Sequence, residues 1–160
     1  MDKRNRYRNH WSLFSGPLYF LSNFYPCSIT MPDGITYQCA EAAFQAQKCA
    51  DLDERRQFSL MNGSIAKKCG RTVDLRPGWN QMRIDVMREV IHAKFTQNPK
   101  LARWLVETKN ELVEKNTWGD RFWGVDFYNG VGENHLGRIL MEEREKLRQD
   151  PLTADDTYGW

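Results

Sequence analysis

The residues with the clearest capacity for chemistry lie in residues 38–50, which read QCAEAAFQAQKCA. An acid, an aromatic ring, an amide and an amine recur there at i, i+3, i+4 and i+7: Glu41, Phe44, Gln45 and Lys48. On an α-helix this spacing places the four side chains in one stripe, about 60° wide and about 10 Å long. Convergent polar groups beside an aromatic ring are typical of a ligand pocket. The alternative is a solvated face with a weak ion pair, which fits poorly because Glu and Lys pair best four residues apart.

Groups that suit phosphate, sugar or base lie further along the chain. Arg71 and Arg76 flank an irregular segment, and a guanidinium presents a fork of donors that matches phosphate. Trp118 and Trp123 lie in WGDRFWGVDFYNGVGEN, an aromatic and glycine-rich loop whose indoles can stack on a base or a sugar. A Glu or Asp beside the anomeric carbon would complete a set suited to a phosphorylated nucleoside.

The stripe needs a helix to hold it, and residues 38–50 have the composition of one. Alanines fill the stretch, which contains no Gly, Pro or β-branched residue. A second face consists only of small side chains: Ala42, Ala43, Ala46, Cys49 and Ala50. We expect this small face to be buried and the stripe to be the accessible side. A β-hairpin leads into the helix, since Pro32 and Gly34 lie in a turn between the strand-like runs CSITM and ITYQ.

The rest of the chain predicts mostly helices. The expected helices span residues 52–61, 64–70, 80–95, 101–109 and 136–149, and residues 111–116 could form a short strand. Ser64 and Asn134 are the expected N-caps of the second and the last helix. The predicted fold class is α+β, a predominantly helical single domain with a small antiparallel sheet or hairpin. We expect a basic N-terminal arm at residues 1–12, the domain at 13–149 and an acidic tail at 150–160.

Composition and motifs exclude several classes of protein. The 160 residues suit one domain, and a formal net charge of +2 does not require a nucleic-acid partner. No 18-residue apolar segment exists and no apolar run follows the charged N-terminus, so we expect neither a membrane span nor a signal peptide. The four cysteines lack CxxC spacing and the three histidines lack ligand spacing, so we expect a reduced, cytoplasmic protein with no metal and no cofactor.

Several short motifs in register resemble the NADAR superfamily, above all its YbiA-like N-glycosidases. The motifs are FLSNFYP, EAAFQAQK, CGR, LRPGW, HAKF, WGD after ELVEKN, and ENHLGRILMEERE. Together they cover roughly residues 13–148. The resemblance implies an enzyme that cleaves the N-glycosidic bond between a phosphorylated ribose and an exocyclic amine. The implied substrates are a ribosylaminopyrimidine phosphate of riboflavin biosynthesis, or ADP-ribose on guanine, including ADP-ribosylated DNA or RNA.

The resemblance also implies roles for matching positions. Glu41, Gln45 and Lys48 match the family's helix glutamate, amide and lysine, and the expected catalytic residues are Glu41, Lys48 and Asp120. The expected substrate-binding residues are Asn23, Phe24, Phe44, Gln45, Arg71, Arg76, Trp118, Gly119, Trp123, Asn134 and Gly137. We expect the acid and the amine of the helix to face the same pocket as the indoles of the late loop.

Two positions depart from the family's pattern. The family often has Ser or Thr at the start of the helix, where this chain has Cys39 and Ala40, and this change predicts a weaker N-terminal cap. The family often has His-Tyr after the glutamate, where this chain has Ala42 and Ala43. The second change bears on which leaving group the site selects.

The mechanism and the function each keep alternatives at this stage. A carboxylate beside the anomeric carbon stabilises the positive charge that develops there, a role for Glu41 with Asp120 as a second carboxylate. Lys48 could hold phosphate, or it could attack the opened sugar. A non-catalytic module that binds ADP-ribose or NAD as a sensor is the first alternative function. An RNA- or DNA-binding protein that works through its basic arm is the second.

Overall fold

The computed structural model describes residues 14–150, which form two compact units. One unit consists of residues 23–99, and the other of residues 14–22 together with residues 100–150. The expected basic arm and nearly all of the expected acidic tail lie outside the described residues. The domain boundaries therefore stay a prediction.

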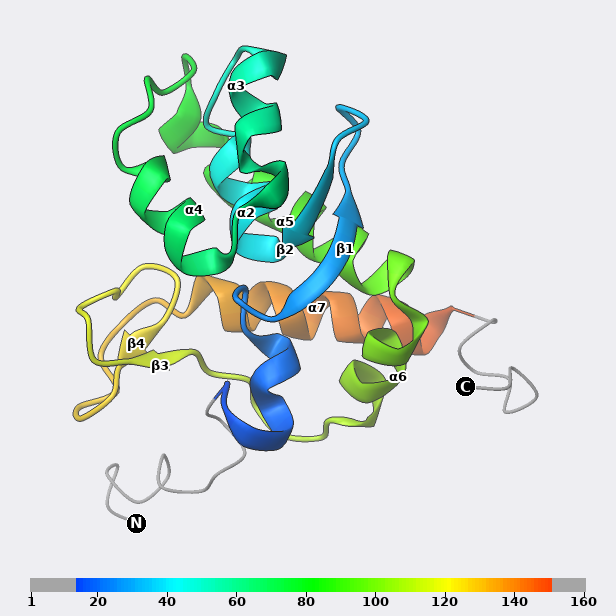
Figure 1. The fold of residues 1–160 in the computed structure, drawn as a ribbon. Helices are drawn as coiled ribbons and strands as arrows, with labels where there is room; N and C mark the ends of the chain where they lie inside the picture. Colours follow the sequence, from blue (N-terminus) through cyan, green and yellow to red (C-terminus); the bar gives the residue numbers. More distant parts are fainter. Residues whose placement is uncertain (1–13, 151–160) are drawn as a thin grey trace. The chain divides into compact units, whose positions relative to one another are not determined.

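The unit of residues 23–99 starts with a β-hairpin and continues with helices (Figure 1). Its elements are β1 Pro26–Thr30, β2 Thr36–Cys39, α2 Ala40–Ala46, α3 Leu52–Gln57, the 3-10 helix η3 Phe58–Leu60, α4 Gly63–Gly70 and α5 Trp79–Gln97. The strands pair antiparallel, with Ile29 opposite Tyr37. Gly34 takes a φ of 81° in the turn, a conformation that glycine adopts without steric cost. The expected hairpin is confirmed.

Helix α2 is the central element of this unit. It contacts β1, β2, α3, η3, α4 and α5, and all seven of its residues are buried. The prediction of an accessible stripe beside a buried small face was therefore wrong, because α2 has neighbours on every side. Glu41 is only 8% exposed and Gln45 only 7%. Ala50, which the prediction placed on the buried face, lies beyond the helix and is exposed.

The helix is also shorter than the predicted range of residues 38–50. Cys39 is still in the extended conformation of β2, with φ −164° and ψ 164°, so the helix begins at Ala40. Beyond Ala46 the backbone tightens, since Lys48 N–H donates to Gln45 O and Cys49 N–H donates to Ala46 O, three residues back in each case. Such tightening is common where a helix runs out of partners for its last carbonyls.

The later helices of this unit follow the predicted pattern with shifted ends. The expected helix at residues 52–61 is α3 followed by the 3-10 helix η3. Helix α4 begins at Gly63, and its N-cap is Asn62, whose Oδ1 accepts from Ile65 N–H, so Ser64 was the wrong cap. Asn is among the best N-cap residues, and it precedes the predicted start. Helix α5 confirms the predicted helix at residues 80–95, and it also buries Lys94 completely.

The second unit is built around the last helix. Its elements are the 3-10 helix η2 Gly16–Leu21, α6 Pro99–Glu107, β3 Lys115–Asn116, β4 Val125–Asp126 and α7 His135–Gln149, with Pro99 itself assigned to the first unit. β3 and β4 pair parallel. Arg144 in α7 donates to Thr108 Oγ1 at 3.0 Å and to Asn110 O at 2.9 Å, which ties α7 to the segment after α6. The expected short strand in residues 111–116 is present, with only two residues.

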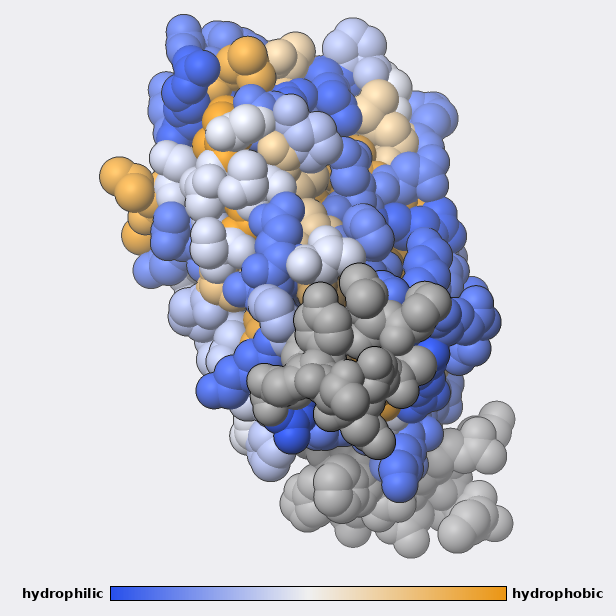
Figure 2. Space-filling model, turned by 90° about the vertical axis from the view of Figure 1, so that its right-hand side faces the viewer, coloured by the Kyte–Doolittle hydropathy of each residue, from blue (hydrophilic) through white to orange (hydrophobic). Residues whose placement is uncertain are grey.

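These elements confirm the predicted fold class, predominantly helical α+β with a small antiparallel sheet. Figure 2 shows a face on which hydrophilic residues predominate and hydrophobic residues appear in small groups. Within residues 14–150, no helix combines the length and the apolarity that a membrane span requires.

Candidate functional site

The first group of candidate residues is organised by α2. Glu41 and Gln45 lie one helical turn apart, and Gln45 Nε2 donates to Glu41 Oε1 at 2.8 Å. Both side chains are buried, so the amide holds the carboxylate in place away from bulk water. A hydrogen bond to a charged acceptor is stronger than one between neutral groups, and it is stronger still in a low-dielectric environment.

Asn23 caps the start of α2 through its backbone. Its carbonyl oxygen accepts from Glu41 N–H at 2.8 Å. Its Nδ2 faces Met87 Sδ at 3.6 Å, while its buried Oδ1 makes no hydrogen bond within residues 14–150. Cys39 supplies a second cap, since its Sγ accepts from Ala42 N–H at 3.4 Å. The expectation of a weaker cap fits this contact, because sulfur is a weak acceptor.

Lys48 lies just beyond the end of α2, and its amine is partly buried. Nζ donates to Gly70 O at 3.3 Å. Burial lowers the pKa of Lys48 below the ordinary lysine value; Glu41 and Cys49 act to raise it, and Arg71 lowers it further. Both Glu41 and Arg71 therefore act electrostatically on this amine. Loss of solvation penalises the charged form and increases the fraction of neutral amine at a given pH.

Arg76 contacts the backbone of Lys48 and lies near the aromatic ring of Trp79, against which Phe44 packs. Arg76 N–H donates to Lys48 O at 2.8 Å, and its guanidinium carbon lies 6.0 Å from the centroid of the Trp79 ring. Phe44 packs against the same indole, with ring centroids 5.3 Å apart and a tilt of 52°. Arg76 Nε is a buried donor with no hydrogen-bond acceptor within residues 14–150. An unpaired buried donor is costly, and an anionic oxygen would satisfy it.

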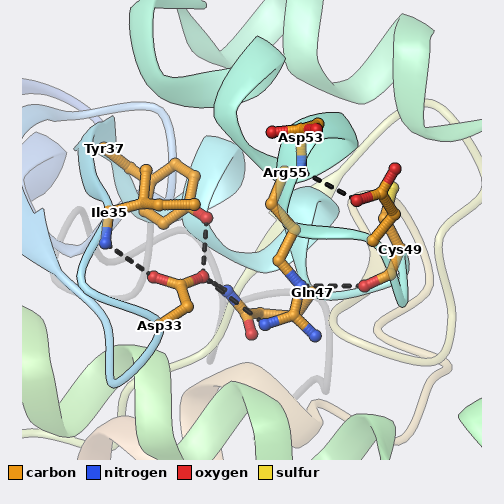
Figure 3. Close-up of polar contacts among 8 residues, drawn as sticks. Asp33, Ile35, Tyr37, Gln47, Cys49, Asp53 and Arg55 are labelled. Atoms are coloured by element: carbon orange, nitrogen blue, oxygen red, sulfur yellow. Dashed lines mark hydrogen bonds and ion pairs between the residues drawn. The ribbon is translucent and has the colours of Figure 1, made fainter.

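A buried carboxylate in the hairpin turn anchors the far end of α2 (Figure 3). Asp33 accepts from Tyr37 Oη at 2.8 Å and from Gln47 Nε2 at 3.1 Å, and it pairs with Arg55 at 3.5 Å. Arg55 Nε in turn donates to Cys49 O at 2.8 Å. The residues on either side of position 48 are thus both held by one cluster.

The second group of candidates lies in the loop after β3, in the other unit. Asn116 Oδ1 and Nδ2 bond the backbone N–H and C=O of Asp120, at 3.0 and 2.8 Å. Asp120 Oδ1 accepts from Phe122 N–H at 3.1 Å and from Trp123 N–H at 2.9 Å. One carboxylate oxygen of Asp120 therefore orders the loop.

The predicted indoles of this loop differ in exposure. Trp118 is 61% exposed, whereas Trp123 is half-buried and packs edge-on against Phe122 with ring centroids 4.8 Å apart. Gly119 takes a φ of 83°, which explains a glycine between Trp118 and Asp120.

Asn134 and Gly137 have structural roles at the start of α7. Asn134 occupies the cap position with a φ of 52°, but its side chain makes no cap bond, so its predicted capping role was wrong. Its Oδ1 accepts from Glu114 N–H at 3.0 Å and its Nδ2 donates to Leu112 O at 2.9 Å. These two bonds connect the segment before β3 to the start of α7. A Cβ on Gly137 would overlap Leu112 O, so this contact requires glycine.

The structure thus sorts the candidates into two groups, one in each unit. The group of residues 23–99 contains Asn23, Phe24, Glu41, Phe44, Gln45, Lys48, Arg71 and Arg76. The other contains Trp118, Gly119, Asp120, Trp123, Asn134 and Gly137. The expectation that both groups share one pocket stays a prediction, as do the roles of the individual residues.

Sequence reasoning missed Trp79 and Asp33. Trp79 is the last residue of LRPGW and follows Arg76 by three positions, a signal that could have marked it as a partner of that guanidinium. Asp33 looked like an ordinary turn residue, and its local sequence carries no sign of its distant partners. Within residues 14–150, no group of three or more His, Cys, Asp or Glu side chains could hold a metal ion. The four cysteines are free.

Comparisons with known proteins identify relatives over most of the chain. The NADAR domain model matches residues 9–148. A riboflavin biosynthesis protein of Vibrio vulnificus is 38% identical over 135 residues, which cover 81% of this chain and 36% of that protein. The N-glycosidase YbiA of Shigella boydii is 37% identical over 129 residues, 79% of each chain.

A solved structure extends the likeness to three dimensions. The NMR structure of the Escherichia coli protein YbiA has a TM-score of 0.76 and 33% sequence identity, and the match covers 91% of this chain and 89% of that one. The chain spans about a third of the Vibrio relative and nearly all of this YbiA chain. The resemblance carried by the motifs is confirmed, and the chain belongs to the NADAR domain family.

Proposed function

We propose that this protein hydrolyses the N-glycosidic bond between a phosphorylated ribose and an exocyclic amine. Curated relatives about 37% identical over most of the chain are N-glycosidases, so the chain is a hydrolase that acts on N-glycosyl bonds. The proposed substrates are a ribosylaminopyrimidine phosphate, in line with the name of the Vibrio relative, and ADP-ribose on guanine. Guanine in DNA or RNA is included in the second class.

The observation that carries the proposal is the buried Glu41 carboxylate, held by Gln45 in the same unit as the Lys48 amine. Cleavage at an anomeric carbon builds positive charge on the ribose. A fixed carboxylate in a water-poor environment stabilises that charge more than a solvated one does, because it need not reorganise during the reaction. We assign this role to Glu41.

The cationic residues of the same unit suit the phosphate of the substrate. Arg71 acts electrostatically on Lys48, and Arg76 offers a buried Nε–H that has no acceptor within residues 14–150. Phosphate oxygens accept such donors in a planar, forked geometry. Trp79 and Phe44 provide an aromatic surface beside these groups for a base or a sugar.

Lys48 has two roles open to it, phosphate ligand or nucleophile. In the second, the amine nitrogen of the glycoside forms a C1′=N bond as the C1′–O4′ bond breaks and O4′ takes a proton. The Lys48 amine then adds to C1′, the exocyclic amine leaves with a proton, and water hydrolyses the lysine imine to release the sugar aldehyde. Burial favours the neutral amine that this step requires.

Asp120 is proposed as a second carboxylate through Oδ2, because Oδ1 is used by the backbone of its own loop. Trp118, which is exposed in the same loop, is proposed as a stacking surface for the leaving base.

The deciding experiment is Glu41→Gln, tested with a ribosylaminopyrimidine phosphate and with ADP-ribosylated guanosine while the released base is detected. We expect turnover to fall by about a hundredfold or more, since the substitution removes the charge but keeps the shape. Glu89→Gln changes an exposed carboxylate of α5 and is the matched control. Undiminished turnover in Glu41→Gln would refute the assignment. If wild type binds ADP-ribose without any turnover and Glu41→Gln binds equally well, the protein is a sensor instead.

A further inference from the structure

Gly70, the last residue of α4, lies where two candidate site residues converge. It is buried, and Lys48 Nζ donates to its carbonyl oxygen at 3.3 Å. A Cβ at this position would overlap Gln45 Oε1 and would lie 2.6 Å from Gln45 Cδ. The backbone of Gly70 is not left-handed, so the need for glycine here is one of space and not of backbone conformation.

The contact with Gly70 sets the orientation of the Gln45 amide. Nε2 points to Glu41 Oε1 at 2.8 Å, which leaves Oε1 directed at Gly70. This buried Oε1 has no hydrogen-bond donor within residues 14–150, so close packing against Gly70, and not a hydrogen bond, holds that end of the amide. A bulkier residue would have to push the amide away from Gly70.

We propose that Gly70 is a positioning residue for the acid and the amine of the site. Its missing side chain provides the room in which the Gln45 amide reaches Glu41, and its carbonyl orients the Lys48 amine. One residue of α4 thereby sets the relative placement of two groups that lie seven positions apart in the sequence. The catalytic consequence rests on the proposed function, whereas the placement itself does not.

A glycine that only packs two helices together predicts a different behaviour. Alanine stabilises a helix relative to glycine, so at a site with spare room Gly70→Ala would raise the melting temperature. Where the new Cβ meets Gln45, the substitution must instead displace the amide. The packing role and the positioning role therefore predict different effects of Gly70→Ala in a variant that lacks the Gln45 amide.

The experiment compares Gly70→Ala, Gln45→Ala and the double variant as a mutant cycle. Solvent exchange of the Gln45 side-chain amide protons, followed by NMR, reports the hydrogen bond to Glu41 without any substrate. Turnover of a ribosylaminopyrimidine phosphate and of ADP-ribosylated guanosine gives kcat and KM. Ser64→Ala, at an exposed position of the same helix, is the control and should leave both readouts unchanged.

We expect Gly70→Ala to speed exchange of the Gln45 amide protons and to lower kcat by about tenfold or more with a smaller change in KM, since even about 1 Å of misplacement is costly. In the Gln45→Ala background the same substitution should change kcat by less than about twofold, because the collision is gone. The proposal would be overturned if Gly70→Ala lowered kcat equally in both backgrounds, or if it left the exchange rate of the Gln45 amide protons unchanged.

Two further outcomes remain decisive. If Gly70→Ala does not fold, recovery of the fold in the double variant supports the collision, and failure to recover overturns it. If the amide is displaced but wild type turns over neither substrate, the positioning role stands while the proposed function fails.

Discussion

Gln45 donates a 2.8 Å hydrogen bond to Glu41 inside α2, and both side chains are buried. A solvated Gln–Glu pair on a helix surface contributes only a few tenths of a kcal/mol. In this buried setting the amide compensates for part of the solvation that the carboxylate has lost, so its removal should affect both stability and chemistry.

Gln45→Met tests this relationship, because it keeps the length of the side chain and removes the donor. We expect unfolding in urea to show a loss of about 1.5–3 kcal/mol, the usual contribution of a hydrogen bond to a charged group. Turnover should also fall, since the carboxylate is no longer held in one place. Gln81→Met, at an exposed position of α5, is the control. Full activity in Gln45→Met would mean that the amide is not needed to orient the acid.

The nucleophile role of Lys48 predicts a covalent adduct and a shifted pH profile. Burial lowers the pKa of this lysine, so kcat should rise with pH and then level off. The midpoint of this rise should lie below the pKa of an ordinary lysine. Borohydride added during turnover should reduce the imine and attach the sugar to residue 48, which mass spectrometry would locate. Lys48→Met should abolish both the covalent adduct and the pH-dependent rise of kcat. An unchanged rate in this variant would exclude attack by Lys48, and an increase confined to KM would indicate a phosphate ligand instead.

The Asp33 cluster predicts acid sensitivity of the unit of residues 23–99. Burial of Asp33 acts to raise its pKa, but hydrogen bonds from Ile35 N–H, Gln47 and Tyr37 and the charge of Arg55 outweigh it, so the pKa lies below its ordinary value. A depressed pKa in the folded state means that the stabilisation is present above the unfolded-state pKa and is lost as the pH falls through the folded-state value.

Urea unfolding of wild type and Asp33→Asn, measured from pH 7 down to about pH 2, checks this prediction. At neutral pH we expect the variant to be less stable by about 3 kcal/mol, because Arg55 loses its buried partner. The difference should begin to shrink as the pH falls below about 4, the ordinary aspartate value, and it should be lost below the lower folded-state pKa of Asp33, where wild type also loses the charge. Asp85→Asn, an exposed α5 carboxylate, should show neither effect. A difference that does not depend on pH would exclude ionisation of Asp33 as its source.

The two oxygens of Asp120 can be separated by substitution. Asp120→Asn keeps an acceptor for Phe122 and Trp123, whereas Asp120→Ala removes it. We expect the alanine variant to lose about 1 kcal/mol of stability, as capping residues do, and the asparagine variant to lose little. If Asp120 is the second carboxylate, turnover should fall in both variants. An active Asp120→Asn enzyme would restrict this residue to ordering the loop.

The sequence alone determined the elements whose signals are local. The turn with Gly34 predicted the hairpin, apolar spacing predicted α5, and the order of short motifs predicted the family. The sequence also marked Glu41, Gln45 and Lys48 as one group of candidate site residues. Such signals depend on the preferences of a residue and its near neighbours, which a linear sequence carries directly.

Only the tertiary structure decided how that set is held. The sequence pattern indicated an accessible stripe on a long helix, but α2 ends at Ala46 and is covered on all sides. The start of α2 is held by the Asn23 carbonyl, the Lys48 amine by the Gly70 carbonyl, and the residues on either side of Lys48 by the Asp33 cluster. These contacts come from other parts of the chain. Burial and hydrogen bonding are set by which distant segments meet, and helix periodicity does not specify those partners.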